Sequence, residues 1–143
     1  MSNLSLFMKK NKKVRENAFY AATKSLCDAD GKPLEWEIKP LTTKESDKIR
    51  ESCTTEVPVK GKPGMVRPKI DSNTYSAKMI TASVVFPDLE DKDLQDSYGV
   101  MTPEDLLKEM LDNPVEYNSL AEFVMNFNGL DESLEEKVEE AKN

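Results

Sequence analysis

Two short segments of the sequence carry residue types that could bind a cation or a phosphate. Asp28-Ala29-Asp30-Gly31 places two carboxylates beside a glycine, as the start of a calcium-binding loop does. Such a loop also needs a bidentate glutamate at its twelfth position, where this chain has Lys39. Lys60-Gly61-Lys62-Pro63-Gly64 has the lysines and glycines of a phosphate loop, but neither its spacing nor the helix start that follows it. We therefore interpret the first segment as a turn and the second as part of a loop.

The chain contains no histidine, and this excludes much of the chemistry that a site could perform. A Ser-His-Asp or Cys-His nucleophile cannot be assembled without one. Cys27 and Cys53 lie far apart and cannot complete an all-cysteine zinc site, so we interpret them as reduced, half-buried thiols. Paired carboxylates stay open as a catalytic option, because the chain has 27 acidic residues, but abundance is not evidence and most of these acids belong on solvated faces. The sequence predicts a protein that binds another protein, without catalysis, metal or cofactor.

Charge is distributed unevenly along the chain. Residues 1–87 hold 16 Lys/Arg and 10 Asp/Glu, a net of +6, and residues 88–143 hold 4 and 17, a net of −13. A general nucleic-acid binder needs its positive charge unopposed, so the split argues against that class. A DNA-binding regulator that uses the basic first half is the rival, and it would bind in a salt-sensitive way. The two halves could attract within one molecule or between neighbours, or could be screened surface charge with no role.

Length and hydropathy indicate one soluble domain. A chain of 143 residues is long enough to bury one hydrophobic core. No stretch approaches the roughly 18 apolar residues that a membrane-spanning helix needs. The first ten residues place an apolar cluster before lysines, the reverse of a secretory signal. We expect a cytosolic protein.

The first half of the chain shows a basic arm, a β-hairpin and one helix. Residues 1–17 join a short apolar turn to a lysine-rich stretch. Residues 18–40 alternate around a turn, which predicts a hairpin with three side chains facing the core: Leu34, Trp36 and Ile38. Thr42 and Glu45 form a capping box that opens a helix to about Cys53. Residues 57–70 are rich in proline and glycine and are predicted to form a loop or irregular hairpin.

The second half is predicted to be helical. Helical spacing of apolar residues and capping residues predict helices over residues 72–86, 91–97 and 102–111. Asn113-Pro114 interrupts the pattern, and helical spacing then continues from Tyr117 to Phe127. In the first of these, one face would carry Tyr75, Met79, Ala82 and Phe86. Residues 131–143 have a thin apolar stripe among six acids and predict only a weak helix. The expected fold class is α+β, a helix-dominant domain with an N-terminal β-hairpin packed on four or five helices. Its expected bounds are a basic arm at 1–17, the domain at 18–130 and an acidic tail at 131–143.

Several short segments, taken in order, form a recognisable pattern. They are Leu4-Ser5-Leu6-Phe7-Met8, Asp30-Gly31-Lys32-Pro33-Leu34-Glu35-Trp36-Glu37-Ile38, Ser52-Cys53-Thr54, Leu94-Gln95-Asp96-Ser97-Tyr98-Gly99-Val100-Met101 and Glu104-Asp105-Leu106-Leu107-Lys108. Together they resemble XkdN-like tail assembly chaperones of contractile-tailed phages and PBSX-type prophages. The resemblance covers about residues 4–127, and none of its motifs is a catalytic signature.

The resemblance implies a viral protein that acts in the cytoplasm of the bacterial host. Proteins of this class are thought to bind the phage tape measure protein and keep it soluble until the tail tube assembles around it. Related chaperones are often also made in a longer, frameshifted form. The alternative function is a structural tail or baseplate component. Apart from the client, the partner that the charge split allows is a second copy of the chain.

A chaperone of this kind needs accessible apolar surface, and the sequence offers it in the segment from Leu106 to Phe127. The candidate partner-binding residues are Leu107, Met110 and Phe127. The competing interpretation is that this apolar stripe is the core of the domain.

Overall fold

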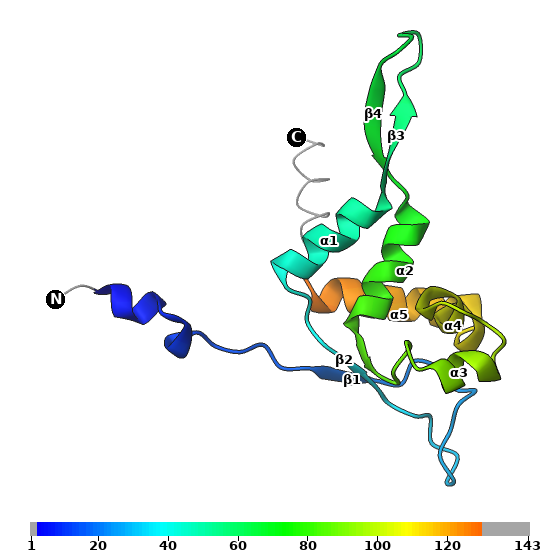
Figure 1. The fold of residues 1–143 in the computed structure, drawn as a ribbon. Coiled ribbons are helices and arrows are strands. Elements are labelled where there is room, and N and C mark those ends of the chain that lie inside the picture. The colour runs from blue at the N-terminus through cyan, green and yellow to red at the C-terminus, as the bar shows by residue number, and fades with distance from the viewer. Residues whose placement is uncertain (1–2, 130–143) are drawn as a thin grey trace, which may run out of the picture.

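The computed structural model describes residues 3–129, and its architecture is built around the short strand β2, Trp36–Ile38 (Figure 1). β1 (Ala18–Tyr20) pairs with one side of β2 and β5 (Val84–Phe86) with the other, both antiparallel. The alternation predicted from the sequence buries Trp36 and Ile38 and turns Glu37 outward. Five α-helices accompany this sheet within the described residues, so the expected α+β fold is confirmed.

The predicted hairpin is an antiparallel pair, but its strands are shorter than expected. The chain between Tyr20 and Trp36 loops away from the sheet, and the carboxylate of Asp28 accepts hydrogen bonds there from Asp30 N and Lys32 N at 2.9 and 3.0 Å. Asp28 therefore organises a turn, as the sequence indicates. The expectation that Leu34 faces the core is wrong, since this side chain is 45% exposed. β2 begins only at Trp36, so the alternation does not extend back to Leu34.

The helix predicted over residues 72–86 ends three residues early. α2 spans Ser72–Ser83, and the next three residues form β5. Lys39 N donates to Ser83 O at 2.8 Å and Val84 pairs with Ile38, so backbone bonds to β2 replace those of another helical turn. Two β-branched residues favour this exchange. Phe86 consequently leaves the predicted helical face and is 64% exposed.

α1 (Thr43–Cys53) begins at the predicted capping box. Glu45 N donates to the Thr42 hydroxyl and Thr42 N donates to the Glu45 carboxylate, both at 3.1 Å. The helix leads directly into a regular hairpin of β3 (Thr54–Pro58) and β4 (Val66–Ile70), where a loop or irregular hairpin was expected. The glycine- and lysine-rich segment at 60–64 is the tip of this hairpin.

Three further helices follow as the sequence predicts. They are α3 (Lys92–Ser97), α4 (Pro103–Met110) and α5 (Pro114–Phe127). Side chains cap all three starts: Asp91, Thr102 and Asn113. Gly129 follows the last helix with φ of +71°, a conformation that glycine adopts without strain.

The core lies where α2 crosses α4 and α5 above the three-stranded sheet (Figure 1). Its fully buried large side chains come from four elements: Trp36, Ile38, Met79, Ile80, Leu106, Leu107, Leu120 and Val124. Tyr20 of β1 stacks on Phe123 of α5 with ring centroids 4.5 Å apart. Glu116 accepts hydrogen bonds from the Thr23 hydroxyl and from Lys24 N, both at 2.8 Å. The sheet is thus fixed to α5 by packing and by polar contacts.

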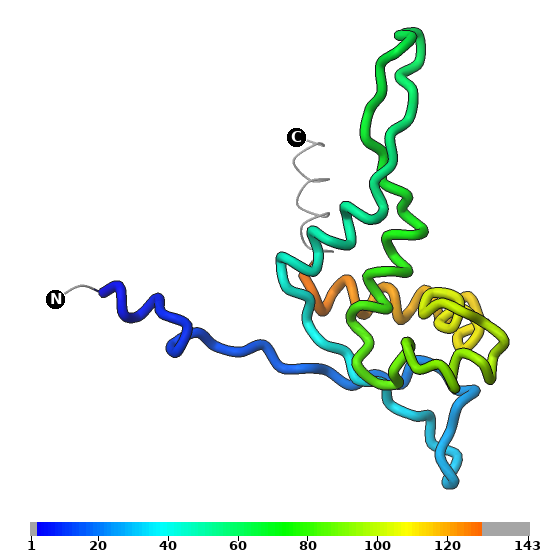
Figure 2. Tube along the Cα trace, viewed as in Figure 1, coloured from blue at the N-terminus to red at the C-terminus, as the bar shows by residue number. Residues whose placement is uncertain are grey.

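Two segments project from this body, the N-terminal arm and the β3–β4 hairpin (Figures 1 and 2). None of the helices within residues 3–129 is long and apolar enough to cross a membrane. The predicted tail at 131–143 lies outside the described residues.

Candidate protein-binding surfaces

The three residues predicted to contact a partner lie in or against the core. Leu107 is 0% exposed and Met110 is 5% exposed, so neither side chain is accessible while α4 stays packed. Phe127 is half-buried and stacks on Phe123 with ring centroids 6.0 Å apart. Leu107 and Met110 are therefore core residues, as the competing interpretation of the apolar stripe expects. Accessible apolar surface lies elsewhere.

The N-terminal arm carries a cluster of exposed apolar side chains, and a basic stretch follows it in the sequence. A 3₁₀ helix spans Asn3–Phe7, and the exposed side chains Leu6, Phe7 and Met8 lie at its end, with Phe7 82% exposed. A second 3₁₀ turn, Lys9–Asn11, begins the run of cations. Figure 2 shows that the arm projects away from the helices and that its C-terminal end continues into β1. A partner can therefore reach this cluster without any change in the core.

Hydrogen bonds hold the base of the arm to the body. Arg15 Nη2 donates to Leu41 O at 2.6 Å, and Asn17 Nδ2 donates to Glu37 Oε2 at 2.7 Å. Within the arm, Asn11 Nδ2 donates to Ser5 O at 2.6 Å and closes the turn between the two 3₁₀ helices. The arm is thus a preformed projection tied at one end.

The β3–β4 hairpin is a second exposed surface, and its charged residues are mostly basic. Met65, Val66 and Ile70 are exposed on it. Its cations are Lys60, Lys62, Arg67 and Lys69, against the single acid Glu56. The sequence contained a signal for these strands, because residues 54–59 and 66–70 include β-branched residues on both sides of a glycine-rich turn. Three prolines across residues 57–70 obscured that signal.

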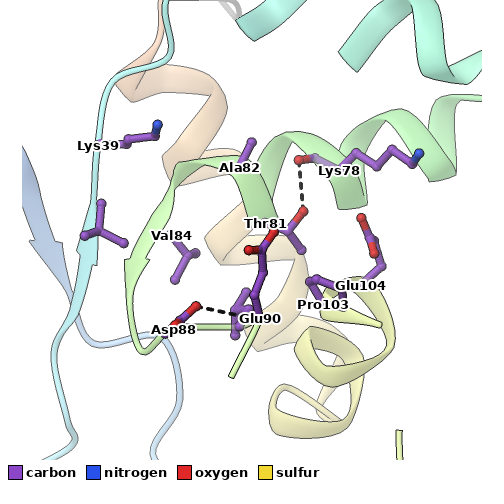
Figure 3. Close-up of a pocket in the computed structure, with 11 residues that line it drawn as sticks. Lys39, Lys78, Thr81, Ala82, Val84, Asp88, Glu90, Pro103 and Glu104 are labelled. Atoms are coloured by element: carbon purple, nitrogen blue, oxygen red, sulfur yellow. Dashed lines mark hydrogen bonds between the residues drawn. The ribbon is translucent and has the colours of Figure 1, made fainter. Parts of the chain in front are cut away.

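A cavity of about 510 Å³ lies beside β5 and α2 (Figure 3). Its apolar lining includes Val84 and Leu89, and its rim carries both signs of charge: Lys39, Lys78, Asp88, Glu90 and Glu104. Asp88 is engaged in a turn, since its carboxylate accepts a hydrogen bond from Glu90 N at 3.0 Å. No group of three or more His, Cys, Asp or Glu side chains within residues 3–129 is arranged to hold a metal ion.

Shifted pKa values in the described chain accompany capping and packing. The hydrogen bond from Lys39 holds the pKa of Glu45 below its ordinary value, and Thr42 adds to the effect. The backbone N–H of Thr74 lowers the pKa of Asp71 at the start of α2. Burial raises the pKa of Tyr117. Glu45 and Asp71 cap helices and Tyr117 packs against the core, so these shifts have structural causes.

The two cysteines differ in environment. Cys27 is exposed, and its thiol donates to Lys24 O at 3.1 Å, whereas Cys53 is buried at the end of α1. Neither forms a disulfide. The expectation that both thiols are half-buried is wrong, because Cys27 is exposed and Cys53 is buried.

Comparison with known proteins gives one family and two full-length relatives. Residues 4–142 match the family of phage XkdN-like tail assembly chaperone proteins. The phage-like element PBSX protein XkdN of Bacillus subtilis strain 168 is 31% identical over 141 residues, covering 99% of this chain and 94% of the relative. The uncharacterised protein YqbN of the same strain is 29% identical over 141 residues, covering 99% of this chain and 93% of the relative.

A solved structure shares the fold. The crystal structure of YqbN superposes with a TM-score of 0.75 over 90% of this chain and 98% of that one. Its sequence identity of 22% makes this a statement about fold alone. The match includes the α+β architecture described above.

Proposed function

Because the chain belongs to the family of XkdN-like phage tail assembly chaperones, we propose that it binds the tape measure protein of its phage and keeps that client soluble until the tail tube assembles. It does so in the cytoplasm of the bacterial host, by binding alone and without a catalytic step. What is proposed is that the client is the tape measure protein. Membership of a phage tail assembly chaperone family is its foundation.

The observation that carries the proposal is the exposed apolar end of the N-terminal arm. Leu6, Phe7 and Met8 are all exposed and lie next to one another on a segment that leads away from the body. A protein that shields an aggregation-prone client needs apolar surface that is accessible before the client arrives. A pair of flexible side chains around an aromatic one suits a helical client, because Met and Leu adapt to the grooves of an amphipathic helix.

The lysines that follow this cluster serve a second purpose. They keep an exposed apolar segment in solution, and they attract acidic stretches of a client at a distance comparable to the roughly 8 Å screening length at physiological salt. The apolar contact then determines how long the complex lasts, since most differences in affinity arise in the dissociation rate. Because charge acts on association and apolar contact on dissociation, added salt should lower the association rate of the client more than it raises the dissociation rate.

Co-expression with the tape measure protein tests the proposal. The chain and the tape measure protein from the same phage gene cluster are produced together, and the soluble fraction of the client is measured after centrifugation. We expect the client to be soluble and to co-purify only when the chain is present. A client that stays in the pellet and fails to co-purify would show that the proposed partner is wrong.

A matched pair of variants locates the contact. Leu6→Ser, Phe7→Ser and Met8→Ser together should abolish solubilisation. The control carries Phe86→Ser, Met101→Ser and Val115→Ser, which remove the same kinds of exposed apolar side chain from the body. The control should solubilise the client as the unaltered chain does.

Mass spectrometry of purified phage particles separates the chaperone from a structural tail or baseplate component. A chaperone should be absent or present in trace amounts. Abundance comparable to a tail protein would overturn the chaperone function while leaving the arm a contact surface.

A further inference from the structure

A strongly basic groove runs between the base of the arm and the start of α1. It consists of two adjoining cavities of about 620 and 410 Å³ that share Lys12, Arg15 and Thr42 in their linings. We call it the basic groove. Its charged lining consists of six cations, Lys9, Lys12, Lys13, Arg15, Lys39 and Arg50, and two anions, Glu45 and Asp47.

Each of the two anions of the basic groove is paired with a cation of the same groove. Glu45 accepts from Lys39 Nζ at 2.6 Å, and Asp47 lies 3.8 Å from Arg50. Arg15 bonds to a neutral carbonyl, that of Leu41. The ammonium groups of Lys9, Lys12 and Lys13 form no hydrogen bond or ion pair within residues 3–129. Four positive charges in one groove are therefore left without a compensating carboxylate.

The described chain ends beside this groove. Asn128 lines it, and the side-chain carbonyl of Asn128 accepts a hydrogen bond from Leu41 N at 2.7 Å, which fixes the end of α5 against the start of α1. The acidic segment 131–143 begins three residues further along the sequence. At roughly 3.3 Å per residue, three residues reach about 10 Å, so the first acids of that segment lie within reach of the groove.

The composition of segment 131–143 complements the groove. It holds six acids and two lysines, a net charge of −4, with Leu134, Val138 and Ala141 at helical intervals. The basic groove has apolar lining from Val14 and Pro40 besides its cations. Covalent attachment near the groove gives the segment an effective concentration in the millimolar range, which lets individually weak ion pairs add up.

We propose that residues 131–143 occupy the basic groove of their own chain, with carboxylates of that segment paired to Lys9, Lys12 and Lys13. The acidic segment then neutralises the base of the arm until an acidic stretch of a client displaces it, and it leaves the apolar end of the arm exposed. The inference is independent of the identity of the client. It also gives the opposite charges of the two halves of the chain a specific point of contact.

Zero-length cross-linking of the full chain tests the proposal and its geometry. A carbodiimide couples a carboxylate to an amine only where the two are in contact. The reagent is applied to an equal mixture of chains with natural and heavy nitrogen, and cross-linked peptides are identified by mass. We expect Lys9, Lys12 and Lys13 to be joined to glutamates of residues 132–140, in pairs that are entirely light or entirely heavy. At about 0.5 M salt, where the screening length falls to roughly 4 Å, these products should decline.

Two outcomes would overturn the proposal. Peptide pairs of mixed isotope would show that the acidic segment docks on a second copy of the chain. Cross-links from that segment to Lys60, Lys62 or Lys69 of the hairpin, or the absence of any to the arm, would show that the basic groove is not its site.

A second measurement uses the rate at which trypsin cuts the arm. Glu132→Gln, Glu135→Gln and Glu136→Gln together should speed cleavage after Lys12 and Lys13 by roughly three- to tenfold, because about three exposed ion pairs are lost. The control, Glu90→Gln, Glu109→Gln and Glu122→Gln, removes the same charge from exposed positions on the body. It should cleave at the unaltered rate. Equal rates in the two variants would refute docking of the segment on the arm.

Discussion

The packed helices and the N-terminal arm use the same kinds of side chain in opposite ways. In α4, Leu106 and Leu107 are fully buried against α2 and the rest of the core. In the arm, Leu6 and Phe7 are exposed on a short 3₁₀ helix that no other described element covers. Apolar pattern alone therefore does not distinguish a core face from an exposed one. The difference lies in whether a second element is present to cover the apolar face.

Stability and binding should accordingly respond to different substitutions. The body should lose folding free energy when its apolar side chains are cut back. The arm should lose affinity for a client without affecting the fold. The substitutions below test this separation.

The largest expected effect is on stability, from truncating a buried residue of α4. Leu107→Ala should lower the free energy of unfolding by about 2–5 kcal/mol, because it removes buried apolar contacts and leaves a cavity. Urea denaturation can be followed by the fluorescence of Trp36, the one tryptophan of the chain, which is buried. Val115→Ala, at an exposed position, should change stability by less than about 0.5 kcal/mol. Equal effects from the two would contradict the burial of Leu107.

The next effect is on binding, from the exposed aromatic residue of the arm. Phe7→Ala should weaken binding of the tape measure protein at least tenfold, about 1.4 kcal/mol, because aromatic anchors carry a large share of interface energy. Its free energy of unfolding should stay within about 0.5 kcal/mol of the unaltered chain. Binding can be measured by titration calorimetry with a soluble client fragment, and stability by urea denaturation. A loss of stability similar to that of Leu107→Ala would show that the arm belongs to the core.

A smaller effect is expected at the capping box of α1, which lies between the two regions. Thr42→Ala should cost about 1 kcal/mol of stability, because Glu45 N would lose its acceptor. Thr43→Ala, one residue later, removes an exposed hydroxyl that forms no hydrogen bond with residues 3–129, and it should cost less than about 0.5 kcal/mol. Thermal unfolding of the two variants in parallel distinguishes them. A cost at Thr43 equal to that at Thr42 would show that the cap is unimportant.

Local signals in the sequence predicted the helices of the body well. Thr42 with Glu45, Asp71, and Thr102 with Pro103 each mark a helix start that the structure contains. These signals succeed because capping satisfies N–H groups within one turn of the helix, so it depends on nearby residues. The family was also recognisable from short segments in order, and the match to residues 4–142 confirms it.

Features that depend on distant partners were not predictable in the same way. Val84–Phe86 continues the apolar spacing of α2, yet it forms β5 because the far edge of β2 offers backbone partners. Leu107 and Met110 were predicted as contact surface, although both are buried in one core cluster with residues of α2 and α5. Phe7 has similar chemistry and no such cover. An isolated sequence does not state which element will lie opposite an apolar stripe.

The smallest expected effect concerns the ion pair of Lys39, the residue after β2, with Glu45 of α1. Because Lys39 lowers the pKa of Glu45 in the folded chain, the charged carboxylate stabilises the fold above its ordinary pKa of 4.5. This contribution is lost as the pH falls below 4.5 and through the lowered folded-state value. Lys39→Met should cost only about 0.2–1 kcal/mol at neutral pH, because both side chains are more than one third exposed and water screens the pair.

The pH dependence separates the charge of Lys39 from its packing. Urea midpoints of the unaltered chain and of Lys39→Met should differ at neutral pH and converge as the pH is lowered and Glu45 is protonated. A difference that persists after protonation would mean that the aliphatic stem of Lys39, and not its charge, stabilises the junction. In that case packing, as in the core, and not charge, as at the base of the arm, would stabilise the junction after β2.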